Sequence, residues 1–219
     1  MPTTTTLSSL NRIGIDESGK GDYFGPLVIA AVFVTPASEQ DLALMQVRDS
    51  KKISDGRIVE MAPDIRMVCP HSVVAIGPQR YNELYAKIKN LNRLLDWGHA
   101  RALENLLQQV DCDLATADQF GDERLILNAL QEKGKQIRLV QRTKAEADLA
   151  VAAASILARA EFLLRLQRLS QELNTTLPKG ASSAVELAGR MVVRKYGRDR
   201  LATVAKLHFK TTTQVLVES

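Results

Sequence analysis

The residues best suited to chemistry lie in a glycine-rich stretch near the start of the chain, Gly14-Ile15-Asp16-Glu17-Ser18-Gly19-Lys20-Gly21-Asp22-Tyr23-Phe24-Gly25-Pro26. Asp16 and Glu17 are adjacent carboxylates at the end of an apolar run, and neighbouring carboxylates repel each other unless a cation offsets their charge. A glycine turn follows, and then a second apolar run. This pattern predicts a strand that delivers paired carboxylates to a site for Mg²⁺ and phosphate.

The same stretch comes close to the P-loop that binds nucleotides, because Gly14, Gly19 and Lys20 have the spacing of that motif. However, Gly21 stands where a Ser or Thr would hold the metal, and two carboxylates in the loop would oppose an anion. This chemistry excludes nucleotide binding of that kind. For the stretch taken alone, a solvated polar turn without function is the alternative.

Two more carboxylates follow predicted strands. Asp118 comes directly after an apolar run at 114–117, and Glu146 follows the run at 137–141. Residues at strand ends converge at one edge of an α/β sheet, and carboxylate oxygens are the ligands that Mg²⁺ prefers. Asp148 is the alternative to Glu146 for this position. Residues two apart on a helix do not share a face, so only one of the two can point to the site.

The elements that would position these groups alternate along the chain. Strands are predicted at 12–16, 27–34, 71–76, 114–117 and 137–141, the first two forming a hairpin. Helices are predicted at 38–45 with Ser38 as N-cap, 55–66 with a break at Pro63, 81–87, 91–110, 122–132, 146–171 and 182–196. Residues 47–54 read as a polar loop. The fold class is therefore α/β, a mixed sheet flanked by helices.

Bulk properties fit an enzyme of a reducing compartment. The 219 residues can form one domain at 12–219, after a frayed tail at 1–11. Cys69 and Cys112 lack metal-type spacing and are expected to be inert thiols. No apolar run reaches about 18 residues, so no membrane span is expected. His71 and His99 are expected to be structural or solvent-facing, and the role of His208 stays open.

Positive charge is concentrated near the end of the chain. The net charge is +4, yet residues 178–210 carry eight lysines or arginines against two acids. The positive residues are Lys179, Arg190, Arg194, Lys195, Arg198, Arg200, Lys206 and Lys210. A basic segment in a chain with an acidic centre favours contact with a polyanion over a merely solvated helix face.

Four ordered segments resemble one family. Asp-Glu-Ser-Gly-x-Gly-Asp-Tyr-Phe-Gly-Pro is similar to the signature of the type 2 ribonucleases H, and its ending resembles ribonuclease HIII rather than HII. The other segments are Ala117–Phe120, Thr143–Arg159, and the pair Leu177–Ala181 and Lys206–Phe209. The resemblance covers about residues 12–212. Many ribonucleases HIII have an extra N-terminal substrate-binding domain. Only about eleven residues precede the first predicted strand here, so we expect a short form without that domain.

The resemblance implies a ribonuclease H-like fold whose helical C-terminal part covers about residues 178–219. It implies endonucleolytic hydrolysis of the RNA strand of RNA–DNA hybrids with Mg²⁺ or Mn²⁺, by two metal ions, leaving 3′-hydroxyl and 5′-phosphate ends. The implied catalytic and metal-binding residues are Asp16, Glu17, Asp118 and Glu146. Glu146 lies two residues after Lys144, as the family's fourth carboxylate does, although a spacing one residue shorter than usual after Lys144 keeps Asp148 open.

The resemblance also implies which residues bind the substrate. They are Ser18, Gly19, Lys20, Gly21, Ser50, Lys51, Lys144 and Lys179, with the glycine loop close to ribose 2′-hydroxyls. Arg142 is a further phosphate partner on similar grounds, whereas Tyr23 is expected to pack internally. The expected protein is a cytoplasmic monomer that binds hybrid duplexes. The alternatives are incision at single ribonucleotides in duplex DNA, as by ribonuclease HII, and a hybrid-binding module without catalysis.

Overall fold

The protein is described from a computed structural model that covers residues 10–118, 137–142 and 145–217. The described chain forms two compact units. The first contains the chain up to Glu17, then Ile29–Val74 and Leu95–Ala160. The second contains Ser18–Val28, Ala75–Leu94 and the chain from Glu161 onward. The boundary therefore passes through the glycine-rich motif, directly after its two carboxylates.

Five strands form one mixed sheet in the order β3-β2-β1-β4-β5. They are β1 (Arg12–Ser18), β2 (Leu27–Val34), β3 (His71–Ile76), β4 (Leu114–Asp118) and β5 (Arg138–Arg142). β1 and β4 run parallel, as do β4 and β5, and all eight residues of β2 are buried. The five predicted strands and the adjacency of the first two are confirmed. β1 runs through both carboxylates to Ser18 rather than ending at Asp16.

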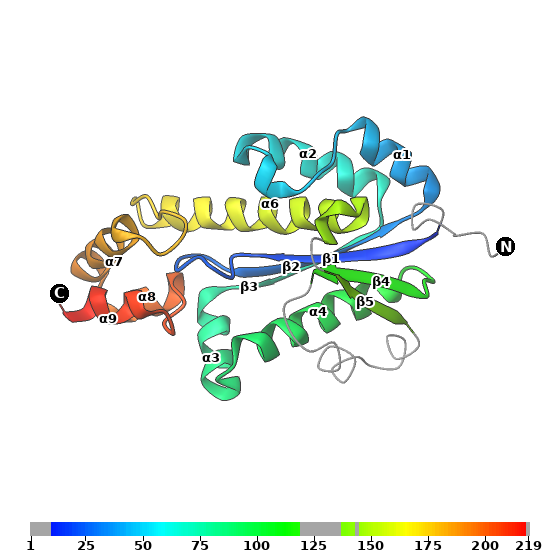
Figure 1. Ribbon diagram of the computed structural model, residues 1–219. Coiled ribbons are helices and arrows are strands. Elements are labelled where there is room, and N and C mark those ends of the chain that lie inside the picture. Colours follow the sequence, from blue (N-terminus) through cyan, green and yellow to red (C-terminus); the bar gives the residue numbers. More distant parts are fainter. Residues whose placement is uncertain (1–9, 119–136, 143–144, 218–219) are drawn as a thin grey trace. The chain divides into compact units, whose positions relative to one another are not determined.

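Helices cover both faces of this sheet (Figure 1). Those of the first unit are α1 (Pro36–Leu44), α2 (Asp55–Val68), most of α4 (Leu91–Leu107) and the first half of α6 (Leu149–Glu172). α6 packs so closely on β1 that a Cβ on Gly14 would lie 2.1 Å from the Ala150 carbonyl carbon. α4 covers the opposite face, where a Cβ on Gly98 would lie 2.6 Å from Ile29. A glycine is required at Gly14, where a Cβ would meet backbone, whereas at Gly98 the end of the Ile29 side chain would have to shift.

The second unit is mainly helical. It contains α3 (Pro78–Ile88), α7 (Ser183–Tyr196), α8 (Arg198–Val204), α9 (Lys210–Val217) and the second half of α6. α7 packs against α8 and α9, and α3 packs against α8. The predicted helix at 182–196 is confirmed, with Gly197 as its C-cap at φ +85°. The helical C-terminal part expected from the family resemblance is present.

Several local predictions were wrong. The N-cap of α1 is Thr35, and Ser38 is its partner in a capping box. α2 continues through Pro63 to Val68, so the missing backbone N–H of Pro63 does not end the helix there. The polar loop at 47–54 contains a 3₁₀ turn, Ser50–Lys52. Glu146 lies in a separate 3₁₀ turn, Ala145–Ala147, before α6 begins.

The remaining predicted elements agree within a few residues or lie elsewhere. The helix at 81–87 begins earlier, at Pro78, because proline suits the first helical turn. The helix predicted at 122–132 and the tail at 1–9 lie outside the described residues. Across the described residues, no helix is long and apolar enough to cross a membrane.

Candidate active site

Two of the candidate carboxylates lie at the ends of neighbouring parallel strands. Ile15 of β1 is paired with Ala117 of β4, so Asp16 and Asp118 each stand one residue further along, at the same edge of the sheet. Glu146 follows β5 in the 3₁₀ turn. The sequence prediction that the strand ends bring these residues to one edge is therefore supported for Asp16 and Asp118. The side chain of Glu146 lies outside the described part.

Asp16 is oriented by hydroxyl and backbone donors. Its Oδ1 accepts a hydrogen bond from the Glu17 backbone N–H at 2.8 Å, and Ser155 of α6 donates another. The Ser155 Oγ lies 2.6 Å from the Ser50 Oγ, and both serines are buried. Burial raises the pKa of Asp16, and the negative charge of Glu17 raises it further, while Lys51 opposes the shift. A divalent cation would relieve this cost of ionising Asp16.

Glu17 points to the other side of the sheet, as alternation along a strand requires. Its Oε2 lies 3.1 Å from the Nε2 of His99, which belongs to α4 and is fully buried. Sequence reasoning missed His99 and took it as a structural or solvent-facing residue. The available signal was its setting between Gly98 and Ala100, because two small neighbours let a helix approach a strand closely.

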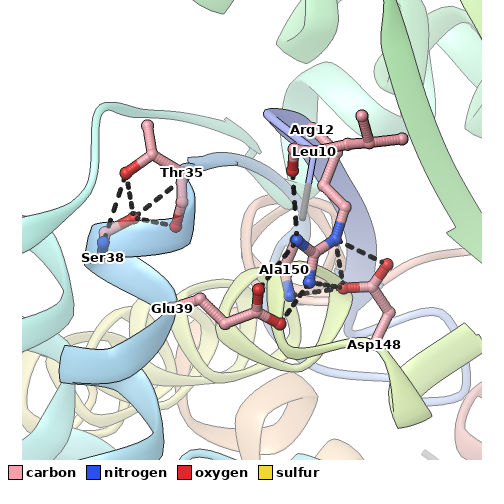
Figure 2. Close-up of polar contacts among 7 residues, drawn as sticks. All are labelled: Leu10, Arg12, Thr35, Ser38, Glu39, Asp148 and Ala150. Carbon is pink, nitrogen blue, oxygen red and sulfur yellow. Dashed lines mark hydrogen bonds and ion pairs between the residues drawn. The ribbon is translucent and has the colours of Figure 1, made fainter. Parts of the chain in front are cut away.

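Asp148 is engaged with Arg12, as Figure 2 shows. The Arg12 Nε donates to both Asp148 oxygens, at 2.9 and 3.0 Å, and the Ala150 backbone N–H donates to Oδ1 at 2.9 Å. Arg12 also pairs with Glu39 at 2.7 Å and is 1% exposed. Burial alone would lower the pKa of Arg12, but the hydrogen bonds and charges of Glu39 and Asp148 outweigh it and raise that pKa. Asp148 therefore stabilises the start of α6, which favours Glu146 over Asp148 as the fourth carboxylate.

The predicted phosphate-binding residues Ser50 and Lys51 lie in the 3₁₀ turn of the first unit. The Asp49 side chain caps this turn by accepting from the Lys51 backbone N–H at 3.0 Å. Lys51 is exposed, whereas the Ser50 hydroxyl is buried against Ser155. Ser50 thus supports Asp16 through Ser155, a role that the sequence did not indicate. Lys144 lies outside the described residues, and so does the side chain of Arg142.

The predicted ribose-reading loop, Ser18 to Gly21, belongs to the second unit. Gly19 has φ +89°, and a Cβ there would lie 2.2 Å from the Pro26 carbonyl oxygen, so only glycine fits. Tyr23 is fully buried, which confirms its predicted packing role. Lys179 is exposed, next to Gly180.

Lys206 departs from the expectation that the basic residues of 178–210 contact a polyanion. It is fully buried, and its ammonium group bonds backbone carbonyls, so it does not contact phosphate. His208 stacks on Tyr85, with ring centroids 4.3 Å apart, and packs against Phe209. In this position His208 completes an aromatic cluster of the second unit.

The donor chemistry fits a divalent metal ion. Asp16, Glu17 and Asp118 carry the hard oxygens that Mg²⁺ and Mn²⁺ prefer at neighbouring strand ends, while Asp16 and Glu17 bond groups on opposite faces of the sheet. Among the side chains that the structure describes, no three carboxylates, histidines or cysteines gather closely enough to hold an ion.

Carboxylates at the ends of adjacent parallel strands, in a sheet covered by helices on both faces, fit an α/β enzyme that acts with a divalent metal ion. The family description that matches this chain is "Ribonuclease HII", over residues 13–212. A ribonuclease HIII of Protochlamydia amoebophila is 48% identical over 213 residues, which are 97% of this chain and 71% of the relative. One of Chlamydia pneumoniae is 45% identical, over 93% of this chain and 70% of the relative.

Solved structures agree with these sequence matches. Bst-RNase HIII in complex with Mn²⁺ superposes with a TM-score of 0.90 at 33% identity, covering 99% of this chain and 74% of the other. RNase H3 of Aquifex aeolicus gives 0.77 at 29% identity, covering 93% and 74%. The chain belongs to the type 2 ribonuclease H family, on its ribonuclease HIII branch. It is a metal-dependent endoribonuclease that hydrolyses the RNA strand of RNA–DNA hybrids.

Proposed function

We propose that Asp16, Glu17, Asp118 and Glu146 are the metal ligands of this ribonuclease H, and that Mg²⁺ or Mn²⁺ serves it. Such ions supply an activated water and stabilise the leaving 3′-oxygen of a phosphodiester. The observation that carries the proposal is the register of β1 and β4, with Asp16 and Asp118 at matching strand ends. Ser155 and His99 orient two of the carboxylates from α6 and α4.

For the substrate, we propose that the loop Ser18 to Gly21 approaches the ribose 2′-hydroxyls and that Lys20, Lys51, Lys144 and Lys179 contact phosphates. At Gly21 a Cβ would meet nothing within 4 Å, so this side of the loop leaves room for a nucleic-acid backbone to approach. A 2′-hydroxyl distinguishes RNA from DNA at each position. Lysines near phosphates add affinity without sequence preference.

We also propose that the chain acts as a monomer in the cytoplasm. Both cysteines, Cys69 and Cys112, are free thiols, which suits a reducing compartment. Size-exclusion chromatography with light scattering tests the oligomeric state. A dimer at working concentration would contradict it.

Cleavage of a hybrid in Mg²⁺, Mn²⁺ or EDTA tests the ligand set. Asp16→Asn, Glu17→Gln, Asp118→Asn and Glu146→Gln should each lower kcat by roughly 10²-fold or more, because residues that act as one unit fail together. Each should also weaken Mn²⁺ binding in calorimetry. Asp64→Asn, at an exposed site on α2, is the matched control. If one of the four variants had unchanged kcat and Mn²⁺ affinity, its residue would not be a metal ligand.

A further inference from the structure

Lys206 is a fully buried lysine of the second unit whose donors meet one backbone turn. Its Nζ donates to the carbonyl oxygens of Asp22 at 2.7 Å and Gly25 at 2.8 Å, with that of Phe24 at 3.5 Å. Its backbone N–H donates to the Tyr23 carbonyl at 2.8 Å. One residue therefore holds the carbonyls of four successive residues. A compact ammonium with three donors suits such a ring of acceptors.

The turn held by Lys206 is bonded to a second loop. The Asp22 Oδ1 accepts a hydrogen bond from the Gly180 backbone N–H at 2.7 Å, and the Tyr23 backbone N–H donates to the Gly180 carbonyl at 2.9 Å. Lys179 directly precedes Gly180, and the glycine loop ends directly before Asp22. Two opposed hydrogen bonds thus fix the distance between these neighbouring segments.

Apolar packing by itself would hold this turn in the core. Tyr23 and Phe24 are fully buried and pack edge to face, with ring centroids 4.9 Å apart. Burying an ammonium group is costly unless polar partners surround it. The carbonyls of Asp22, Phe24 and Gly25 meet that requirement, and the side chain of Lys206 fixes the direction of these three groups. A hydrophobic side chain at position 206 would fill the space and keep the backbone bond to Tyr23, but it would leave those three carbonyls without their donor.

We propose that Lys206 is a positioning residue for substrate binding, which fixes the turn Asp22–Gly25 from inside and, through Asp22 and Gly180, holds Lys179 at a set distance from Gly19–Gly21. The inference rests on the proposed function, in which Lys179 and the glycine loop bind the hybrid. Lys206 acts without contacting the nucleic acid. Its effect belongs to KM, because the turn that Lys206 holds contains none of the proposed metal ligands.

Lys206→Met in the full chain is the first test, with Lys87→Met, at an exposed site on α3, as matched control. We expect KM for a hybrid to rise about tenfold, the loss of roughly one charged contact, with kcat changed less than about twofold. Trypsin should also cut after Lys20 faster in Lys206→Met than in the wild type. If Lys206→Met and the wild type had equal KM values, the proposal would be overturned, whether or not trypsin cut the loop of the variant faster.

The trypsin comparison needs no substrate, so it tests the turn separately from the proposed function, which hybrid cleavage by the wild type tests. A second pair of variants stays informative if Lys206→Met fails to fold. Asp22→Asn keeps an oxygen for the Gly180 N–H, whereas Asp22→Ala removes it. We expect Asp22→Ala, but not Asp22→Asn, to raise KM, and the double variant with Lys179→Ala to be no worse than either single change. Additive effects would overturn the coupling through Gly180.

Discussion

Asp148→Asn separates the two carboxylates near the start of α6 by their different roles. The change removes the charge that faces Arg12 but keeps an oxygen for the Ala150 N–H. Breaking a buried ion pair by removing one partner costs about 3–5 kcal/mol. Arg12 keeps Glu39 at 2.7 Å, so the lower end, about 3 kcal/mol, applies. For a chain of this size that loss lowers Tm by about 6–12 °C.

Thermal unfolding by circular dichroism measures the loss of stability, and hybrid cleavage at 20 °C in Mg²⁺ measures the effect on kcat. We expect Asp148→Asn to retain kcat within a few-fold, since enough folded protein remains from a stability of about 5–15 kcal/mol. Asp64→Asn, an exposed aspartate on α2, should change stability by less than about 0.5 kcal/mol. Lost cleavage at unchanged Tm would make Asp148 a ligand and refute its assignment to the fold.

Four further predictions concern His99, the basic segment, the choice of substrate and Lys206. His99→Ala should weaken Mn²⁺ binding about 10–100-fold in calorimetry, and His99→Gln should restore part of it; equal affinity in both would limit His99 to packing. Replacing Arg194, Lys195, Arg198 and Arg200 together should weaken hybrid binding and flatten its salt dependence; an unchanged slope would make this stretch a solvated face. The kcat/KM for a run of ribonucleotides should exceed that for a single ribonucleotide in the same duplex, and a reversed order would favour the ribonuclease HII-like activity. Burial lowers the pKa of Lys206 to about 7 from 10.5, so the unfolded chain binds more protons between these values and the urea midpoint should rise with pH there; an equal rise in Lys206→Met would assign it to other groups.

Much of the fold was predictable because the strands are short apolar runs that stand out in the sequence. β2 is apolar at nearly every position, and the runs before Asp16 and Asp118 are short and bounded by polar residues. Periodicity also located most helices. The boundary errors at Thr35 and Pro63 arise where one local hydrogen bond or tertiary packing outweighs a residue's average preference.

The candidate site was predictable only in part. The resemblance to ribonucleases H indicated which carboxylates form the site, and the strand register supports two of them, Asp16 and Asp118. The supports of those carboxylates were hidden, because His99 and Ser155 approach from helices distant in sequence. Lys206 was misread for a related reason. A count of charges does not distinguish a lysine in solvent from one surrounded by carbonyls.

The alternation of Asp16 and Glu17 has a consequence for how this enzyme can change. Asp16 depends on Ser155 of α6, and Glu17 depends on His99 of α4, on the opposite face of the sheet. For the proposed ligands, substitutions on one helix can therefore adjust one carboxylate while the other keeps its surroundings. Under the proposed ligand set, the surroundings of the two carboxylates can thus change independently, although the two residues are adjacent in the chain.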